Sequence, residues 1–237
     1  MTDDPQRSRR ASLRTVRVEA CVVSVEEGIA AVAAGADRLE FCVDLSVGGL
    51  SPKLEDVRRL TDSVDVPVLV MVRPRAGAFT ASPDEVTAME REVEALRTTG
   101  AAGFVAGVST ADGSIDAESV SRLVDAGAGL PMTYHRAFDE LSFWSDGGSP
   151  DPARALEMLG AVGVARVLTG AGPGRAIDRR EHVRRLIAAC PSMLTPVIAG
   201  GIRHDHVIQL LDETRAEEIH ARASAIPALI DVLRAGA

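Results

Sequence analysis

A chain of 237 residues, of which 46% are hydrophobic and 25% charged, holds enough apolar material for one large α/β domain or two small ones. Its 34 acidic residues outnumber its 26 basic ones, and the net charge of −8 argues against non-specific nucleic-acid binding, which needs clustered Lys and Arg. The sequence contains no apolar segment of the roughly 18 residues that span a membrane, and its three cysteines, an odd number, argue against a disulfide framework. These features favour a cytoplasmic protein with reduced thiols.

The first residues form a segment of their own. Residues 1–16 include a basic run at 7–14 but no long apolar stretch of the kind found in signal peptides, so they are predicted to be a disordered N-terminal tail. The remainder, residues 17–237, shows no domain boundary and is predicted to be one domain. A polar Gly/Ser loop at 142–150 is its only low-complexity interruption.

From residue 17 onward, short apolar runs alternate with longer amphipathic segments. The predicted strands are 17–21, 38–42, 66–72, 103–107, 130–135, 164–169, 195–200 and 217–220. The predicted helices are 25–34, 53–63, 83–99, 116–126, 152–162, 179–189, 204–212 and 226–235. Ser51 before Pro52, and Ser82 before Pro83, are residue pairs typical of helix starts.

The alternation indicates the fold class. Short apolar runs that each lead into a helix are the signature of βαβ units and a parallel sheet. Eight such units in about 220 residues predict a single (β/α)8 TIM barrel with parallel strands, and an open doubly wound sheet is the alternative. An open sheet more often carries a G-x-G-x-x-G turn after its first strand, whereas the turn here reads Cys21-Val22-Val23-Ser24. The barrel is therefore favoured.

Two matching triplets end the first two predicted strands: Glu19-Ala20-Cys21 and Glu40-Phe41-Cys42. Because side chains alternate across a strand, the Glu and Cys of each triplet share a face, and we expect both pairs to point into the barrel near its C-terminal end. That is the end at which TIM barrels build their sites. The alternative is that each cysteine is a small apolar core residue.

Further polar residues follow the other strands, in the strings Arg73-Pro74-Arg75, His135-Arg136-Ala137-Phe138-Asp139, Gly200-Gly201 and His220-Ala221-Arg222. One hypothesis is an enzyme acting on a small anionic or sugar-like metabolite. Its catalytic candidates are Glu19, Glu40, His135, Asp139 and His220. Its substrate-binding candidates are Arg73, Arg75 and Arg136, whose guanidinium groups suit carboxylate or phosphate, and Gly200 and Gly201, whose bare backbone suits phosphate.

Two other interpretations stay open. The polar residues could be an ion-pair network that fills the top of the barrel, or the barrel could be a scaffold that only presents interfaces. The functional interpretation depends on these groups gathering at the C-terminal end, with little comparable charge expected at the opposite end.

Several strings together resemble the CutC family: the two E-x-C triplets, Gly48-Gly49-Leu50-Ser51-Pro52, Met71-Val72-Arg73-Pro74-Arg75, His135-Arg136-Ala137-Phe138-Asp139 and Glu218-Ile219-His220. They occur in order over residues 17–220. The resemblance implies a cytoplasmic TIM barrel with a role in copper homeostasis, in which Cys21 and Cys42 match the proposed copper-binding cysteines. The chemistry agrees, because soft thiolates select Cu(I) and two on neighbouring strands could share one ion.

The partners expected from the sequence are therefore a copper ion or a small anionic ligand, with no nucleic acid and no membrane. The chain contains no Walker loop, no H-E-x-x-H and no C-x-x-C, and no organic cofactor is expected. A homo-oligomer is left open.

Overall fold

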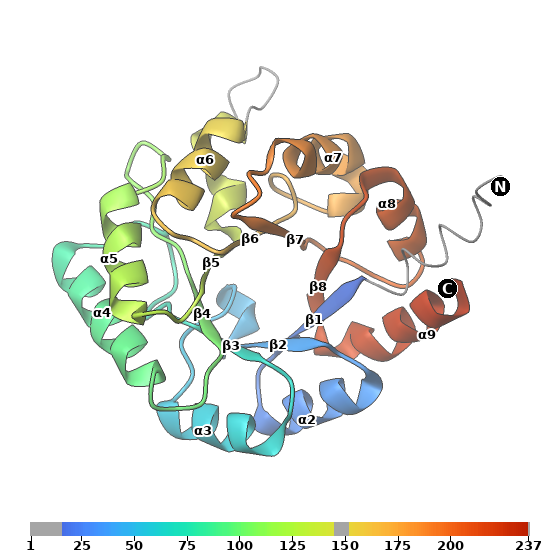
Figure 1. Cartoon of the computed structure of the whole chain (residues 1–237), viewed down its shortest axis with the longest axis horizontal. Coiled ribbons are helices and arrows are strands. Elements are labelled where there is room, and N and C mark those ends of the chain that lie inside the picture. Colours follow the sequence, from blue (N-terminus) through green and yellow to red (C-terminus); the bar gives the residue numbers. More distant parts are fainter. Residues whose placement is uncertain (1–15, 145–151, 237) are drawn as a thin grey trace.

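A computed structural model describes residues 16–144 and 152–236. Eight parallel strands pair in chain order and close into a barrel, and the helices form a ring around it (Figure 1). The strands are β1 (Arg17–Val22), β2 (Arg38–Phe41), β3 (Val68–Met71), β4 (Gly103–Ala106), β5 (Met132–Tyr134), β6 (Arg166–Thr169), β7 (Thr195–Ile198) and β8 (Glu218–Arg222). The prediction of a single (β/α)8 TIM barrel with parallel strands is confirmed, and the open sheet is excluded.

The α-helices of the described residues are α2 (Val25–Ala34), α3 (Leu54–Ser63), α4 (Pro83–Leu96), α5 (Ala117–Gly127), α6 (Ala153–Ala161), α7 (Arg180–Ala189), α8 (Val207–Thr214) and α9 (Ile226–Gly236). Short 3-10 helices occupy several loops: η1 (Leu45–Val47), η2 (Arg136–Glu140), η3 (Ser142–Trp144), η4 (Ala176–Arg179) and η5 (Ala223–Ala225). The tail predicted for residues 1–16 lies outside the described residues except for Val16, as does most of the loop predicted at 142–150. None of the described helices combines the length and apolar character that crossing a lipid bilayer requires.

Local sequence explains where the helices start. Ser82 caps α4 with a complete capping box, in which Ser82 and Glu85 each bond the other's backbone N–H, and Pro83 follows. The pair Ser51-Pro52 does not act in this way, because α3 begins only at Leu54. Instead, the Ser51 hydroxyl accepts a hydrogen bond from the backbone N–H of Arg73 at 2.9 Å and so ties this loop to the end of β3.

Two predicted elements extend beyond the observed ones. The strand predicted over 195–200 ends at Ile198, because the backbone turns through the left-handed region at Gly200 (φ 98°) and Gly201 (φ 69°). The helix predicted over 83–99 ends at Leu96, and Gly100 (φ 80°) lies in the turn that leads to β4.

Residue alternation divides the core into two layers. Outward-facing residues such as Val18, Ala20 and Phe41 belong to the large apolar cluster between strands and helices. Inward-facing residues such as Cys21 and Cys42 belong to a separate small cluster inside the barrel. This parity is what the E-x-C triplets predict.

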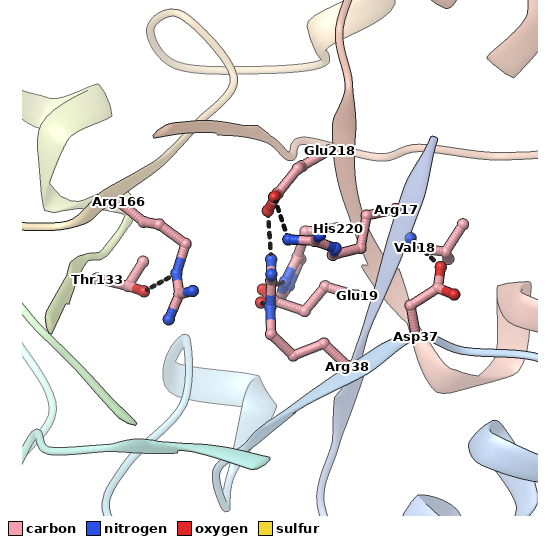
Figure 2. A network of polar contacts seen from close by, with 9 residues as sticks. All are labelled: Arg17, Val18, Glu19, Asp37, Arg38, Thr133, Arg166, Glu218 and His220. Carbon is pink, nitrogen blue, oxygen red and sulfur yellow. Dashed lines mark hydrogen bonds and ion pairs between the residues drawn. The ribbon is translucent and has the colours of Figure 1, made fainter. Parts of the chain in front are cut away.

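The N-terminal half of the barrel interior holds a buried ion network (Figure 2). Arg38, at the start of β2 and 3% exposed, lies between two carboxylates. Its Nε donates to Glu19 Oε2 at 2.5 Å, and its Nη2 donates to Glu218 Oε2 at 2.7 Å. Glu218 also accepts from the more exposed Arg17 at 2.7 Å, and Arg166 on β6 donates to a neighbouring threonine. The expectation of little charge at this end of the barrel is therefore wrong.

Candidate functional site

The thiols of Cys21 on β1 and Cys42 just after β2 meet inside the barrel. Their Sγ atoms lie 3.7 Å apart, and both residues are buried. They form a small cluster with Leu69, Met71 and Val105 from β3 and β4. The contact with Cys42, together with burial, raises the pKa of the Cys21 thiol far above its ordinary value. Without a cation, this thiol is therefore protonated.

Glu40 lies beside the thiols and is only 3% exposed. Its Oε1 lies 3.8 Å from Cys21 Sγ, and its Oε2 accepts no hydrogen bond from any described residue. Burial raises the pKa of Glu40 to about 7. A buried carboxylate oxygen without a partner is costly, so this position calls for a proton, a cation or a ligand.

His220 on β8 completes the cluster. Its Nδ1 lies 2.8 Å from Glu19 Oε1, and the ligand atoms of Cys21, Glu40 and His220 all lie within 4.8 Å of one another. Burial alone would raise the pKa of Glu19, but its hydrogen bond to His220 and the charge of that imidazole hold it at about 2. With Nδ1 directed at this carboxylate, Nε2 is the imidazole nitrogen left for another partner. A carboxylate behind a histidine is the arrangement that orients metal-binding imidazoles.

Two cavities open at the C-terminal ends of the strands. The first cavity, of about 670 Å³, is lined by residues that include Glu40, Met71, His135 and Asp139. The second cavity, of about 680 Å³, lies between the ends of β7 and β8 and is lined by residues that include Gly200, Gly201 and His220. Arg136 and Arg222 line both cavities, so the cavities are neighbouring parts of one opening, which we call the mouth of the barrel. Neither Cys21 nor Cys42 lines either of these two cavities.

His135 and Asp139 both line the first cavity, but they differ in how many hydrogen bonds they form. His135 is buried, its Nδ1 accepts a hydrogen bond from the backbone N–H of Ala137 at 3.2 Å, and its ring packs against Phe79. Burial and the charge of Arg73 lower the pKa of His135 to about 3, so its imidazole is neutral. Asp139 has both oxygens engaged, by Arg136, by a threonine hydroxyl and by backbone N–H groups after β6. These hydrogen bonds hold the loop after β6 in place.

The arginines predicted to hold an anion differ in position. The guanidinium of Arg73 donates to the carbonyl oxygens of Val47, Gly49 and Gly77 at 2.8 to 3.1 Å, which fixes the loops around the first cavity. Arg75 does not line either cavity, because the chain turns outward after β3 and Arg75 pairs with Glu85 at the start of α4.

Arg136 and Arg222 remain directed at the mouth. Arg136 donates through Nε to Asp139 at 2.7 Å and is 41% exposed, so part of its guanidinium is free. Arg222 ends β8 and is exposed, and it forms no ion pair within the described segments. Arg222 has the inward parity of His220 two residues earlier, and this parity is the signal by which the sequence marks it as a site residue.

Comparisons with known proteins agree with this architecture. The model of the CutC family matches residues 16–225. A human protein named copper homeostasis protein cutC homolog is 36% identical over 87% of this chain and 72% of its own length, and a CutC family protein from Agrobacterium fabrum is 37% identical over 89% and 80%.

Solved structures show that the fold is shared. The putative copper homeostasis protein CutC from Streptococcus agalactiae superimposes with a TM-score of 0.79 at 24% identity, over 88% of this chain and 98% of that one. Phosphoribosyl anthranilate isomerase from Thermococcus kodakaraensis, at 18% identity and a TM-score of 0.63 over 92% and 99% of the two chains, shares the fold alone. The resemblance in the sequence is confirmed: this chain belongs to the CutC family.

Proposed function

We propose that this chain serves copper homeostasis by binding Cu(I) through the thiols of Cys21 and Cys42. The observation that carries the proposal is the contact of two buried sulfurs at 3.7 Å inside the barrel. Soft thiolate and thioether ligands select Cu(I), and the thioether residue Met71 lies in the same cluster. A cytoplasmic location, where thiols stay reduced, suits such a site.

The sulfur separation fits a bent metal centre better than a linear one. With metal–sulfur bonds of about 2.3 Å, as for zinc, two sulfurs lie about 3.8 Å apart on a tetrahedral centre and about 4.6 Å apart on a linear centre. The observed 3.7 Å matches the tetrahedral value and leaves room for further ligands. Glu40 and His220 are placed to supply them, with Glu19 orienting the imidazole.

The first cavity reaches residues that lie next to the thiols. Glu40 and Met71 line it, and both also lie beside Cys21 and Cys42. An ion that enters this cavity therefore meets a carboxylate and a thioether before it reaches the two sulfurs. Binding releases the thiol protons, because the ligand form of cysteine is the thiolate.

Anaerobic titration of Cu(I) against a chromogenic chelator tests the proposal. The reduced protein and the Cys190→Ser control should each withdraw one equivalent of Cu(I), since Cys190 lies at the end of α7, away from the barrel interior. The double variant Cys21→Ser/Cys42→Ser should lose that equivalent. An unchanged affinity in the double variant would exclude these thiols as the site.

A second candidate is an enzyme that acts on a small anionic or sugar-like metabolite. The specific observation in its favour is the unpartnered Oε2 of Glu40 in a cavity that also holds His135 and Arg136. A thermal-shift screen of anionic and sugar-like metabolites tests it. We expect at least one compound to raise the melting temperature of the protein and to lose that effect with Arg136→Gln, and a screen in which no compound stabilises the protein would count against an enzyme.

A further inference from the structure

The second cavity is strongly basic. Among the described residues no Asp or Glu lines it, whereas three arginines and two histidines do: Arg136, Arg203, Arg222, His204 and His220. The chain as a whole carries a net charge of −8, so this gathering of basic residues runs against its overall composition. A concave site lined by one sign of charge concentrates ligands of the opposite sign, which here are anions.

Two of these basic residues already have acidic neighbours outside the cavity. Arg136 pairs with Asp139, and His220 pairs with Glu19. By contrast, Arg203 and Arg222 are exposed and form no ion pair in the part of the chain that the structure describes. Their guanidinium groups are therefore available to a ligand.

The turn after β7 adds backbone donors. Gly200 and Gly201 line the cavity with φ of 98° and 69°, and their N–H groups donate to no backbone carbonyl among residues 16–144 and 152–236. A Cβ at position 200 would lie 3.0 Å from the carbonyl oxygen of Gly174, so the turn holds a residue without a side chain. Bare N–H groups beside arginines are suited to a phosphate, which offers several acceptor oxygens at once.

The cavity also continues toward the rest of the site. Arg136 and Arg222 line the first cavity as well as the second, and the first cavity holds Glu40, Asp139 and Glu140. The mouth thus has a basic compartment and a mixed one, separated by two arginines. A volume of about 680 Å³ for the basic compartment is in the range of small-molecule sites.

We propose that the second cavity binds the phosphate group of a small phosphorylated metabolite, whose remainder passes Arg136 and Arg222 into the first cavity. This proposal goes beyond copper binding. It rests on the second candidate function, an enzyme, and names the class of ligand that this enzyme would bind. The phosphate is held by Arg203, Arg222 and the N–H groups of the Gly200-Gly201 turn.

Isothermal titration calorimetry with glycerol 3-phosphate, inorganic phosphate and glycerol, at fixed ionic strength, tests the proposal. Saturable binding of glycerol 3-phosphate should weaken at least about tenfold in Arg222→Gln. The matched control is Arg97→Gln, which removes the same charge at the C-terminal end of α4, on the opposite side of the barrel, and should leave binding unchanged. Arg222 is exposed, so its replacement is not expected to disturb folding.

Other results of the same titrations would also test the proposal. An absence of saturable phosphate-dependent binding, or equal weakening by both variants, would overturn the proposal. Inorganic phosphate binding as tightly as glycerol 3-phosphate would support the phosphate site and overturn the extension into the first cavity. The variant Cys21→Ser/Cys42→Ser should keep phosphate binding while it loses copper, so failure of the copper site and failure of the phosphate site are distinguishable.

Discussion

Replacing Arg38 by methionine removes the central cation of the buried network while it keeps most of the side-chain volume. Arg38 is 3% exposed and donates charge-assisted hydrogen bonds to Glu19 and Glu218 at 2.5 and 2.7 Å. Removing one partner of a buried ion pair costs about 3–5 kcal/mol, because the remaining charge stays buried. Each carboxylate keeps a second partner, His220 or Arg17, so we expect a loss near the lower value, about 3 kcal/mol.

The matched control is Arg17→Met, which removes a cation from the same network at a side chain that is 54% exposed. An exposed pair contributes at most about 1 kcal/mol. For a chain of this size, each kcal/mol corresponds to roughly 2–4 °C in melting temperature. Differential scanning calorimetry should therefore show a drop of about 6–12 °C for Arg38→Met and of at most about 4 °C for Arg17→Met. Equal small shifts in the two variants would refute the reasoning that the burial of Arg38 makes its pairs important.

Two further predictions concern His135, which lines the first cavity. Burial and Arg73 hold the pKa of His135 at about 3, below its ordinary 6.5, so the unfolded chain binds more protons between these values and stability falls as pH drops from about 6.5 toward 3. The melting temperature of the native sequence should thus fall more steeply on acidification than that of His135→Asn, and parallel pH profiles would contradict this. In Gly107→Ala, the added Cβ would lie 2.5 Å from His135 Nδ1, so the urea midpoint should drop by the equivalent of about 1–3 kcal/mol. An unchanged midpoint would show that the packing at Gly107 is looser than the structure has it.

The inward or outward direction of strand residues could be predicted from the sequence, and it accounts for the predicted position of the two thiols. Because inward and outward positions alternate strictly, the triplets that end at Cys21 and Cys42 had to place both thiols on one face. The same rule applied to the starts of the strands would have found Arg38, two residues before Glu40. The pairing of Arg38 with Glu218 joins strands far apart in the sequence, so no local motif marks the network.

Loop paths and contact distances could not be predicted in this way. Arg73 and Arg75 are two residues apart, yet one points at carbonyl groups around the first cavity and the other pairs with Glu85 outside it. No periodic pattern governs a chain after it leaves its strand. Ser51 shows the same limit, since its partner is the backbone of Arg73 rather than the start of a helix. The 3.7 Å between the sulfurs likewise depends on the stagger of β1 against β2, which the sequence alone does not determine.

The position of copper in the protein can be seen directly by anomalous diffraction at the copper edge from crystals loaded with Cu(I) under anaerobic conditions. If the thiols form the site, the strongest anomalous peak lies within about 2.3 Å of both Cys21 Sγ and Cys42 Sγ, inside the barrel and beside Glu40. Copper found only at Cys190 or at surface histidines, with no peak between the two buried sulfurs, would contradict it.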